Sequence, residues 1–266
     1  MSGFRAASYA IQRFILRRQY LTRRLEHATF KVRTSDVVGR HIYKYGRHEP
    51  ALTDWIQRNI RVEDHDVLID VGANIGWYGV LFAQLCRGRD ARVLCFEPEP
   101  ENFALLTHNL EQNNADCVDA LKLGVSDNAD GSALHLFGDN NRGRHSVLPI
   151  NDGERIDIQT ARLDDLLATD GLKDYTPRLI KIDIEGFELM AMCGATNTLE
   201  RCRTVIMEFS PHFMRAGGLE PADLLHLMRD AGFTAGLLEV GERKATQIER
   251  ILADDKQQDI IWQRSI

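Results

Sequence analysis

Short apolar runs and amphipathic stretches alternate along most of the chain. The strand-length runs "VLIDVGA" at 67–73 and "RVLCFEP" at 92–98 are each followed by a stretch with helical spacing, at 76–86 and 100–114. The same order returns toward the C-terminus. Strands that alternate with helices are typical of a parallel sheet covered by helices. The pattern therefore predicts an α/β fold with a doubly wound, mostly parallel sheet over residues 61–266.

Residues 1–60 do not follow this alternation and predict an N-terminal extension built of helix and short strands. Six arginines lie between positions 5 and 24. A partial apolar stripe at helical spacing accompanies them: Ile11, Phe14, Ile15 and Leu21. We expect a basic helix that packs on its own domain with solvated arginines, or else a peripheral contact with a membrane surface or an acidic partner. Residues 30–50 suggest short strands and a turn, and residues 51–60 a helix.

Composition restricts the function classes and the compartment. The 266 residues carry a formal net charge of −6 and a pI of about 5.9. A nucleic-acid partner is therefore not expected, because such binders need a basic face. Five cysteines form an odd set without a CxxC pair, which disfavours disulfides and a zinc site. With no apolar run of the roughly 20 residues that span a bilayer and no signal peptide, we expect a cytoplasmic protein.

The glycine-bearing turn after the first strand carries the first candidate chemistry. A dinucleotide fingerprint that starts at Gly72 would need glycines where Asn74 and Trp77 stand, and both are too bulky for a pyrophosphate. Asp70, two positions before the first glycine, instead suits a ligand with an ammonium and a sulfonium, S-adenosylmethionine. Glu97 ends the next strand, where a carboxylate can accept hydrogen bonds from both ribose hydroxyls. An NAD-dependent oxidoreductase shares this last feature and is the alternative.

A second acidic cluster lies in "LIKIDIEGFE" at 179–188. Lys181, Asp183 and Glu185 alternate with isoleucines, so that a strand would carry the charged set on one face. Burying such a charged row without partners is costly, but the cost is avoided where the strand's carboxyl end opens into a ligand crevice. We therefore expect Asp183 near the transferred methyl and Glu185 at the start of the next helix. Glu188 is either a ligand contact or a cap of that helix.

Transfer to a hydroxyl also needs a group that takes the proton. His145 lies in the polar loop at 138–154 and is the leading candidate, with Asp183 as the alternative and His212 as a further one. Glu49 could reach the amino group of the cofactor or a substrate hydroxyl. No His or Cys spacing accompanies the acids, so no metal is predicted.

The chain resembles the FkbM-type methyltransferases in the order and spacing of several motifs over roughly residues 38–210. The matching stretches are "YGRHEP" at 45–50, "LIDVGANIGWYG" at 68–79, "FEPEPENFALLTHNL" at 96–110, "LDDLL" at 163–167, "IKIDIEGFE" at 180–188 and "GA" at 194 and 195. The resemblance implies a class I, Rossmann-like methyltransferase fold and S-adenosylmethionine as cofactor. It also implies O-methylation of a small molecule or of a sugar or glycan hydroxyl. An RNA methyltransferase is the other alternative, because of the N-terminal arginines.

Two sets of site residues follow. The residues expected to bind the cofactor are Glu49, Asp70, Gly72, Ala73, Asn74, Gly76, Glu97, Pro98, Asn102, Gly124, Val125 and Asp183. The residues expected to act in catalysis are Asp183, His145 and Glu185. The oligomeric state is not predicted.

Overall fold

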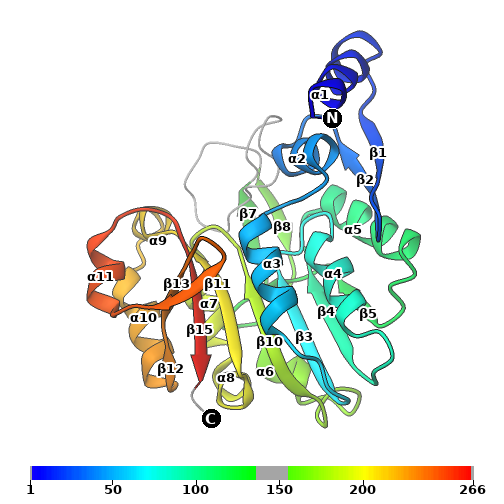
Figure 1. The fold of residues 1–266 in the computed structure, drawn as a ribbon. Helices are drawn as coiled ribbons and strands as arrows, with labels where there is room; N and C mark the ends of the chain where they lie inside the picture. Colours follow the sequence, from blue (N-terminus) through cyan, green and yellow to red (C-terminus); the bar gives the residue numbers. More distant parts are fainter. Residues whose placement is uncertain (1, 136–154, 265–266) are drawn as a thin grey trace.

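A nine-stranded, mostly parallel sheet forms the centre of the protein (Figure 1). The computed structural model describes residues 2–135 and 155–264. The parallel strands, in spatial order, are β11 (Thr204–Phe209), β10 (Thr176–Ile182), β3 (Asp66–Val71), β4 (Arg92–Phe96) and β5 (Val118–Leu121). An antiparallel strand, β15 (Gln258–Arg264), pairs with β11 at the far side. The expected α/β architecture with a mostly parallel sheet is confirmed.

Strand β3 is buried along its whole length, as its continuous apolar sequence predicts for a central strand of a parallel sheet. Its alternate residues enter two different cores. Val67 and Ile69 pack in one hydrophobic cluster, whereas Leu68 packs in the other. Helices therefore cover both faces of the sheet, which explains why both faces of the strand are buried.

The helices divide between these two cores. One face carries α3 (Pro50–Asn59), α4 (Trp77–Leu85) and α5 (Pro100–Gln112). The other core receives α6 (Leu163–Leu167), α7 (Glu188–Cys193), α8 (Thr196–Arg201), α9 (Pro211–Ala216), α10 (Pro221–Asp230) and α11 (Ile248–Ala253). Among residues 2–135 and 155–264, no helix combines the length and the apolar character that a membrane crossing requires.

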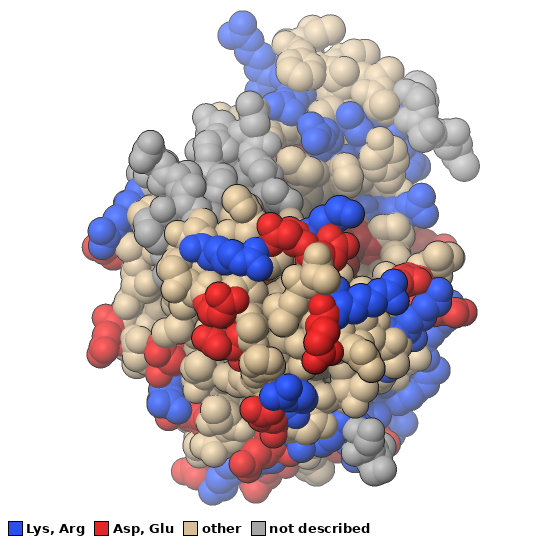
Figure 2. Space-filling model, turned by 90° about the vertical axis from the view of Figure 1, so that its left-hand side faces the viewer, with Lys and Arg blue, Asp and Glu red and all other residues tan. Residues whose placement is uncertain are grey.

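The N-terminal arm projects beyond one end of the sheet (Figure 1). It consists of α1 (Ser2–Ala10), a π-helical turn η1 (Ile11–Ile15), β1 (Tyr20–Arg24), β2 (Thr29–Arg33) and α2 (Val37–Tyr45). In Figure 2 the upper end of the molecule shows Lys and Arg among uncharged side chains, and acidic side chains gather lower down. The expected basic helix stops at residue 15, and Arg23 and Arg24 lie instead in β1, which pairs antiparallel with β2.

Helix α2 replaces the short strands and turn that we expected around residues 37–45. Asp36 caps its start by accepting the backbone N–H of Gly39 at 2.8 Å, and Gly46 ends it in the left-handed conformation, at φ 71°. The valines at its start argue against a helix in isolation. These two caps and the packing of buried Ile42 override that local preference.

Side-chain amides fasten the arm to the sheet domain. Asn109 of α5 and Asn113, which caps the end of α5, accept the backbone N–H groups of Lys31 and Thr29 in β2, at 2.7 and 2.8 Å. Buried residues of the arm also join the core beneath α3 and α4. The arm and the sheet domain therefore share one hydrophobic core.

Short strands frame the remaining loops. β6 (Gly124–Val125) pairs with β9 (Thr160–Ala161), and β7 (Ser132–His135) pairs with β8 (Arg155–Ile158). The last two lie on either side, in the sequence, of the segment that contains His145, and His145 itself lies outside the described residues.

A C-terminal hairpin was not foreseen. β12 (Phe233–Thr234) pairs with β15, and β13 (Gly236–Glu239) turns into β14 (Glu242–Ala245). The turn residues Val240 and Gly241 both have positive φ, 50° and 79°. Two such residues suit a tight hairpin turn, but valine is rare there, so the sequence carries no turn signal.

Candidate active site

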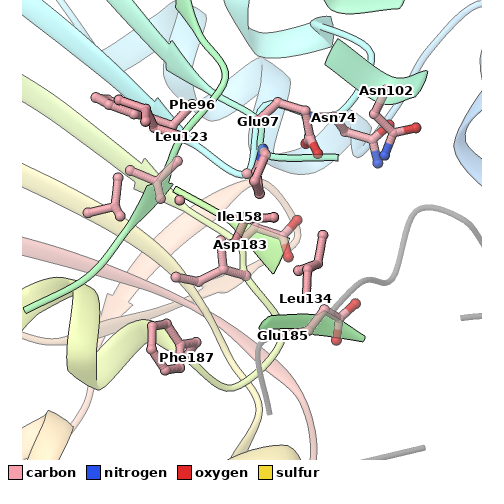
Figure 3. Close-up of a pocket in the computed structure, with 16 residues that line it drawn as sticks. Asn74, Phe96, Glu97, Asn102, Leu123, Leu134, Ile158, Asp183, Glu185 and Phe187 are labelled. Carbon is pink, nitrogen blue, oxygen red and sulfur yellow. The ribbon is translucent and has the colours of Figure 1, made fainter. Parts of the chain in front are cut away.

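Two adjoining cavities open at the carboxyl ends of the parallel strands. Both are lined by Gly72, Asn74, Asp183 and Glu185. The apolar cavity also has walls of Phe96, Leu123, Val125, Leu134, Ile158 and Phe187 (Figure 3). The polar cavity also has walls of His48, Glu49, Tyr78, Lys181 and Glu208. Ligands of open α/β sheets bind at this edge, so the cavities form the candidate active site.

The turn between β3 and α4 requires its glycines for packing. Gly72 has φ 82°, and a Cβ at this position would lie 2.0 Å from the carbonyl oxygen of Asp183. Gly76 has φ 88°, caps α4, and leaves room for Leu106. Only glycine combines this conformation with such close contacts. The loops after β3 and β10 therefore touch, which brings Asp183 to the cavity wall.

Glu97 connects the end of β4 to this turn. One carboxylate oxygen accepts the backbone N–H of Asn74 at 2.8 Å, and the other accepts that of Glu99 at 3.0 Å. Burial raises the pKa of Glu97 to about 8, although both N–H groups act in the opposite direction. In Figure 3 its side chain lies beside Asn74 at the edge of the apolar cavity. The carboxyl group thus stands where sequence reasoning expects a ribose.

The other predicted cofactor residues are distributed over both cavities. Pro98, Asn102, Gly124 and Val125 line the apolar cavity, and Ala73 lines the polar one. Gly76 contributes through the turn conformation described above. These residues all lie at the same edge of the sheet, although they come from separate segments of the chain.

Asp70 lies deeper than expected. It is fully buried in β3, directly opposite Lys181 of β10, and neither oxygen accepts a hydrogen bond from a described residue. Burial raises the pKa of Asp70 to about 6, and the charge of Lys181 opposes this. Asp70 is absent from the lining of both cavities over the described part of the chain. Its direct contact with a cofactor stays a prediction.

Buried Lys181 and partly exposed Asp183 form an ion pair in the wall of the polar cavity. The ammonium lies 3.2 Å from the carboxylate and 5.0 Å from the centre of the Tyr78 ring. Burial acts to raise the pKa of Asp183, but Lys181 and hydrogen bonds outweigh it, so the net pKa lies below the usual value. Asp183 is therefore held as a carboxylate, a weak base at neutral pH.

Three acids meet beside this ion pair. Carboxylate oxygens of Asp183, Glu185 and Glu208 lie within 4.8 Å of one another. Burial and the charges of Asp183 and Glu185 raise the pKa of Glu208 to about 10. A protonated Glu208 that donates to Asp183 accounts for the proximity of these two side chains.

His48 was missed by sequence reasoning and lies in the polar cavity. Burial lowers its pKa below 6.5, while Glu49 acts to raise it. Its Nε2 atom is 3.5 Å from one oxygen of Glu49, and the hydroxyl of Tyr78 donates to the other at 2.5 Å. The imidazole is thus neutral at neutral pH and can accept a proton. Its only sequence signal was its place beside Glu49 and Pro50, the helix start.

Glu185 and Glu188 differ from the expected placement. Glu185 has φ 51° and precedes α7, which begins at Glu188, so our expectation of Glu185 at the helix start is wrong. Glu188 is fully buried and accepts the N–H groups of Ile184 and Gly186 at 3.3 and 3.1 Å, as a loop-fastening cap. His212 is exposed on α9 and lines neither cavity within the described residues.

Comparison with known proteins agrees with the motifs. Residues 70–235 match the family described as "Methyltransferase FkbM domain". Hexuronic acid methyltransferase AglP of Haloferax volcanii is 31% identical over 169 residues, 64% of this chain and 64% of AglP. 2-O-methyltransferase NoeI of Sinorhizobium fredii is 28% identical over 178 residues, 61% of this chain and 70% of NoeI.

A solved structure, methyltransferase FkbM from Methylobacillus flagellatus, is 20% identical with a TM-score of 0.48, over 77% of this chain and 45% of that chain. The chain spans just under two thirds of AglP and less than half of this solved chain. The family match covers well over half of the chain, from the last residues of β3 to just after β12. The protein therefore belongs to the FkbM family of methyltransferases.

Proposed function

We propose that the protein transfers the methyl group of S-adenosylmethionine to a hydroxyl of a sugar or another small polyhydroxylated acceptor. The observation that carries this proposal is the pair of adjoining cavities that share Asn74 and Asp183. One cavity has the chemistry of a nucleoside site and the other that of a hydroxyl site. The names of AglP and NoeI, a hexuronic acid methyltransferase and a 2-O-methyltransferase, support the acceptor class.

The residues present fit the cofactor. The apolar walls suit an adenine ring, and Glu97 stands at the cavity edge with a carboxyl group that can accept ribose hydroxyls once it is ionised. The side-chain oxygen of Asn74 is buried and accepts no hydrogen bond from a described residue. Asn74 lines both cavities, and this oxygen would be an acceptor for the ammonium of the methionine part.

We assign the proton transfer to His48. When bound, the cofactor supplies a methyl group on a positively charged sulfur, so the protein has to align the acceptor and take its proton. His48 is neutral at neutral pH and is oriented by Glu49. Asp183, held ionised by Lys181, would orient the hydroxyl through a hydrogen bond rather than remove its proton.

Two alternative activities have less support. A dinucleotide would need space at the turn after β3, but Asn74 is bulky and the carbonyl of Asp183 occupies the space above Gly72. An RNA substrate would need basic walls, whereas Glu49, Asp183, Glu185 and Glu208 line the polar cavity. A small hydroxyl acceptor suits these walls better than a polyanionic RNA.

The test is direct. The protein is incubated with S-adenosylmethionine labelled on its methyl group and a panel of sugars, uronic acids and polyols, and labelled products are identified by mass spectrometry. We expect a methyl ether on at least one acceptor, formed roughly a hundredfold more slowly by Asp183→Asn. Methylation confined to nitrogen or carbon atoms, or to RNA, would overturn the proposal.

A further inference from the structure

The tip of the N-terminal arm exposes several large apolar side chains that are close together in the sequence. Elsewhere on the described chain, large apolar side chains are exposed only singly. Ile11, Phe14, Ile15 and Leu16 lie in or beside η1, with 48, 68, 71 and 55% of their surface exposed. No residue of η1 is buried. We call these four residues the apolar tip. Contiguous exposed side chains of this size usually mark an interaction site.

Arginines surround the apolar tip. The guanidinium of Arg13 lies 5.0 Å from the centre of the Phe14 ring, and Arg17 and Arg18 follow directly as exposed residues. Residues 1–47 contain eleven Lys and Arg against two Asp and Glu, a formal charge of +9. Since the whole chain carries −6, the remaining residues carry −15. Positive charge is thus concentrated in the part of the molecule that exposes the apolar residues (Figure 2).

The apolar tip is held in a defined position relative to the active site. The Tyr9 hydroxyl of α1 donates to the carbonyl of Thr34, just after β2, and Gln12 of η1 donates to the hydroxyl of Tyr43 in α2 at 2.7 Å. Val37 and Val38 of α2 line the polar cavity. In Figure 1 the arm lies beyond the carboxyl ends of the parallel strands. The tip and the cavities therefore lie toward the same end of the molecule.

We propose that the apolar tip docks on the surface of an anionic lipid bilayer, with Phe14, Ile15 and Leu16 entering the interface and the arginines meeting the headgroups. Apolar side chains ringed by cations are the combination that holds a helix in the plane of such a surface. A second copy of the chain would bring two arms of equal positive charge together. A nucleic acid would match the charge but would leave the aliphatic side chains without a partner.

The test is sedimentation of the full chain with vesicles of phosphatidylcholine alone, and of phosphatidylcholine with an equal part of phosphatidylglycerol. We expect the anionic vesicles to bind at least about tenfold more protein, and added salt to weaken the binding. The double variant Phe14→Ser, Ile15→Ser should lose this binding, as should Arg17→Glu, Arg18→Glu. Val240→Ser is the matched control, because Val240 is a fully exposed apolar residue on the distant β13–β14 turn.

Circular dichroism and cofactor affinity, which should match those of the parent, establish that the variants are folded. Equal binding of parent and double variant to anionic vesicles would overturn the proposal. So would a dimer in analytical ultracentrifugation that the Phe14→Ser, Ile15→Ser change abolishes, or binding to RNA but not to vesicles.

Discussion

The carboxylate of Asp183 lies 3.2 Å from the ammonium of Lys181, and its backbone carbonyl fills the space above Gly72. One residue thus joins the charged row of β10 to the turn after β3, and both features come from motifs that are more than 100 residues apart. The finding explains why the turn and the acidic stretch occur together in one chain. Each is incomplete as a site without the other.

Asp183→Asn should reduce turnover by roughly a hundredfold, because the amide keeps the shape but loses the charge that orients the hydroxyl. Cofactor affinity, measured by calorimetry, should change much less. Asp165→Asn, at a largely exposed acid of α6, is the control. Equal losses of turnover and cofactor affinity would show that Asp183 is a cofactor ligand instead.

His48→Gln should lower turnover by a hundredfold or more, roughly the contribution of a general base. Since burial lowers the pKa of His48 below 6.5, kcat/KM of the parent should fall only below that pH, as the imidazole takes up a proton. The variant should lack this acid limb. His212→Gln, at an exposed histidine, should behave like the parent. An unchanged acid limb in the His48 variant would assign the base elsewhere.

Glu97→Ala should weaken cofactor binding by about 1.5 to 3 kcal/mol, the usual contribution of hydrogen bonds to a charged group. The pKa of Glu97 in the ligand-free protein is about 8, and the ribose hydroxyls need the ionised form. Affinity should therefore rise with pH up to about 8, with proton release on binding at pH 7. Calorimetry in buffers of different ionisation enthalpy measures this release, and Glu97→Gln should abolish it. Parent-like binding by both variants would mean that Glu97 is not the ribose ligand.

Ligand-free stability should fall as the pH rises toward 8. Glu97 and Glu188 have folded-state pKa values raised by burial to about 8 and about 7. A folded state that binds more protons than the unfolded one loses stability above the unfolded pKa, here from about pH 4.5 upward. Thermal melts of Glu97→Gln should show a shallower decline of Tm between pH 5 and 8. If the Tm of the parent and that of the variant decline equally with pH, Glu97 is ionised in the folded protein.

Gly72→Ala should destabilise the protein much more than Gly88→Ala. Both glycines have positive φ, 82° and 76°, so both changes carry a backbone cost of about 1 to 2 kcal/mol. Only the first also drives a Cβ to 2.0 Å from the Asp183 carbonyl, whereas nothing lies within 4 Å of the second. Urea unfolding of the two variants separates the two effects. Equal destabilisation by the two changes would mean that the loop after β10 moves away from the added Cβ at little cost in free energy.

Sequence periodicity predicted the central fold because its strands are long apolar runs with helices between them, as in β3 and β4. The motifs also predicted which edge of the sheet holds Glu97, Asn74 and Asp183. Periodicity failed at α2, where the caps Asp36 and Gly46 outweigh a valine-rich start, and at the Val240–Gly241 hairpin, whose turn residues give no local signal. In both places, side-chain caps or strand pairing decide the structure.

The sequence by itself determined the order of strands and helices, the glycine turn and the family. These features depend on residues close together in the chain, whose spacing reports local backbone geometry and burial. Only the tertiary structure decided that Asp70 is buried against Lys181, that His48 lines the same cavity as Asp183, and that the arm presents an apolar tip. Protonation and exposure depend on which distant groups come into contact, and no local spacing records that.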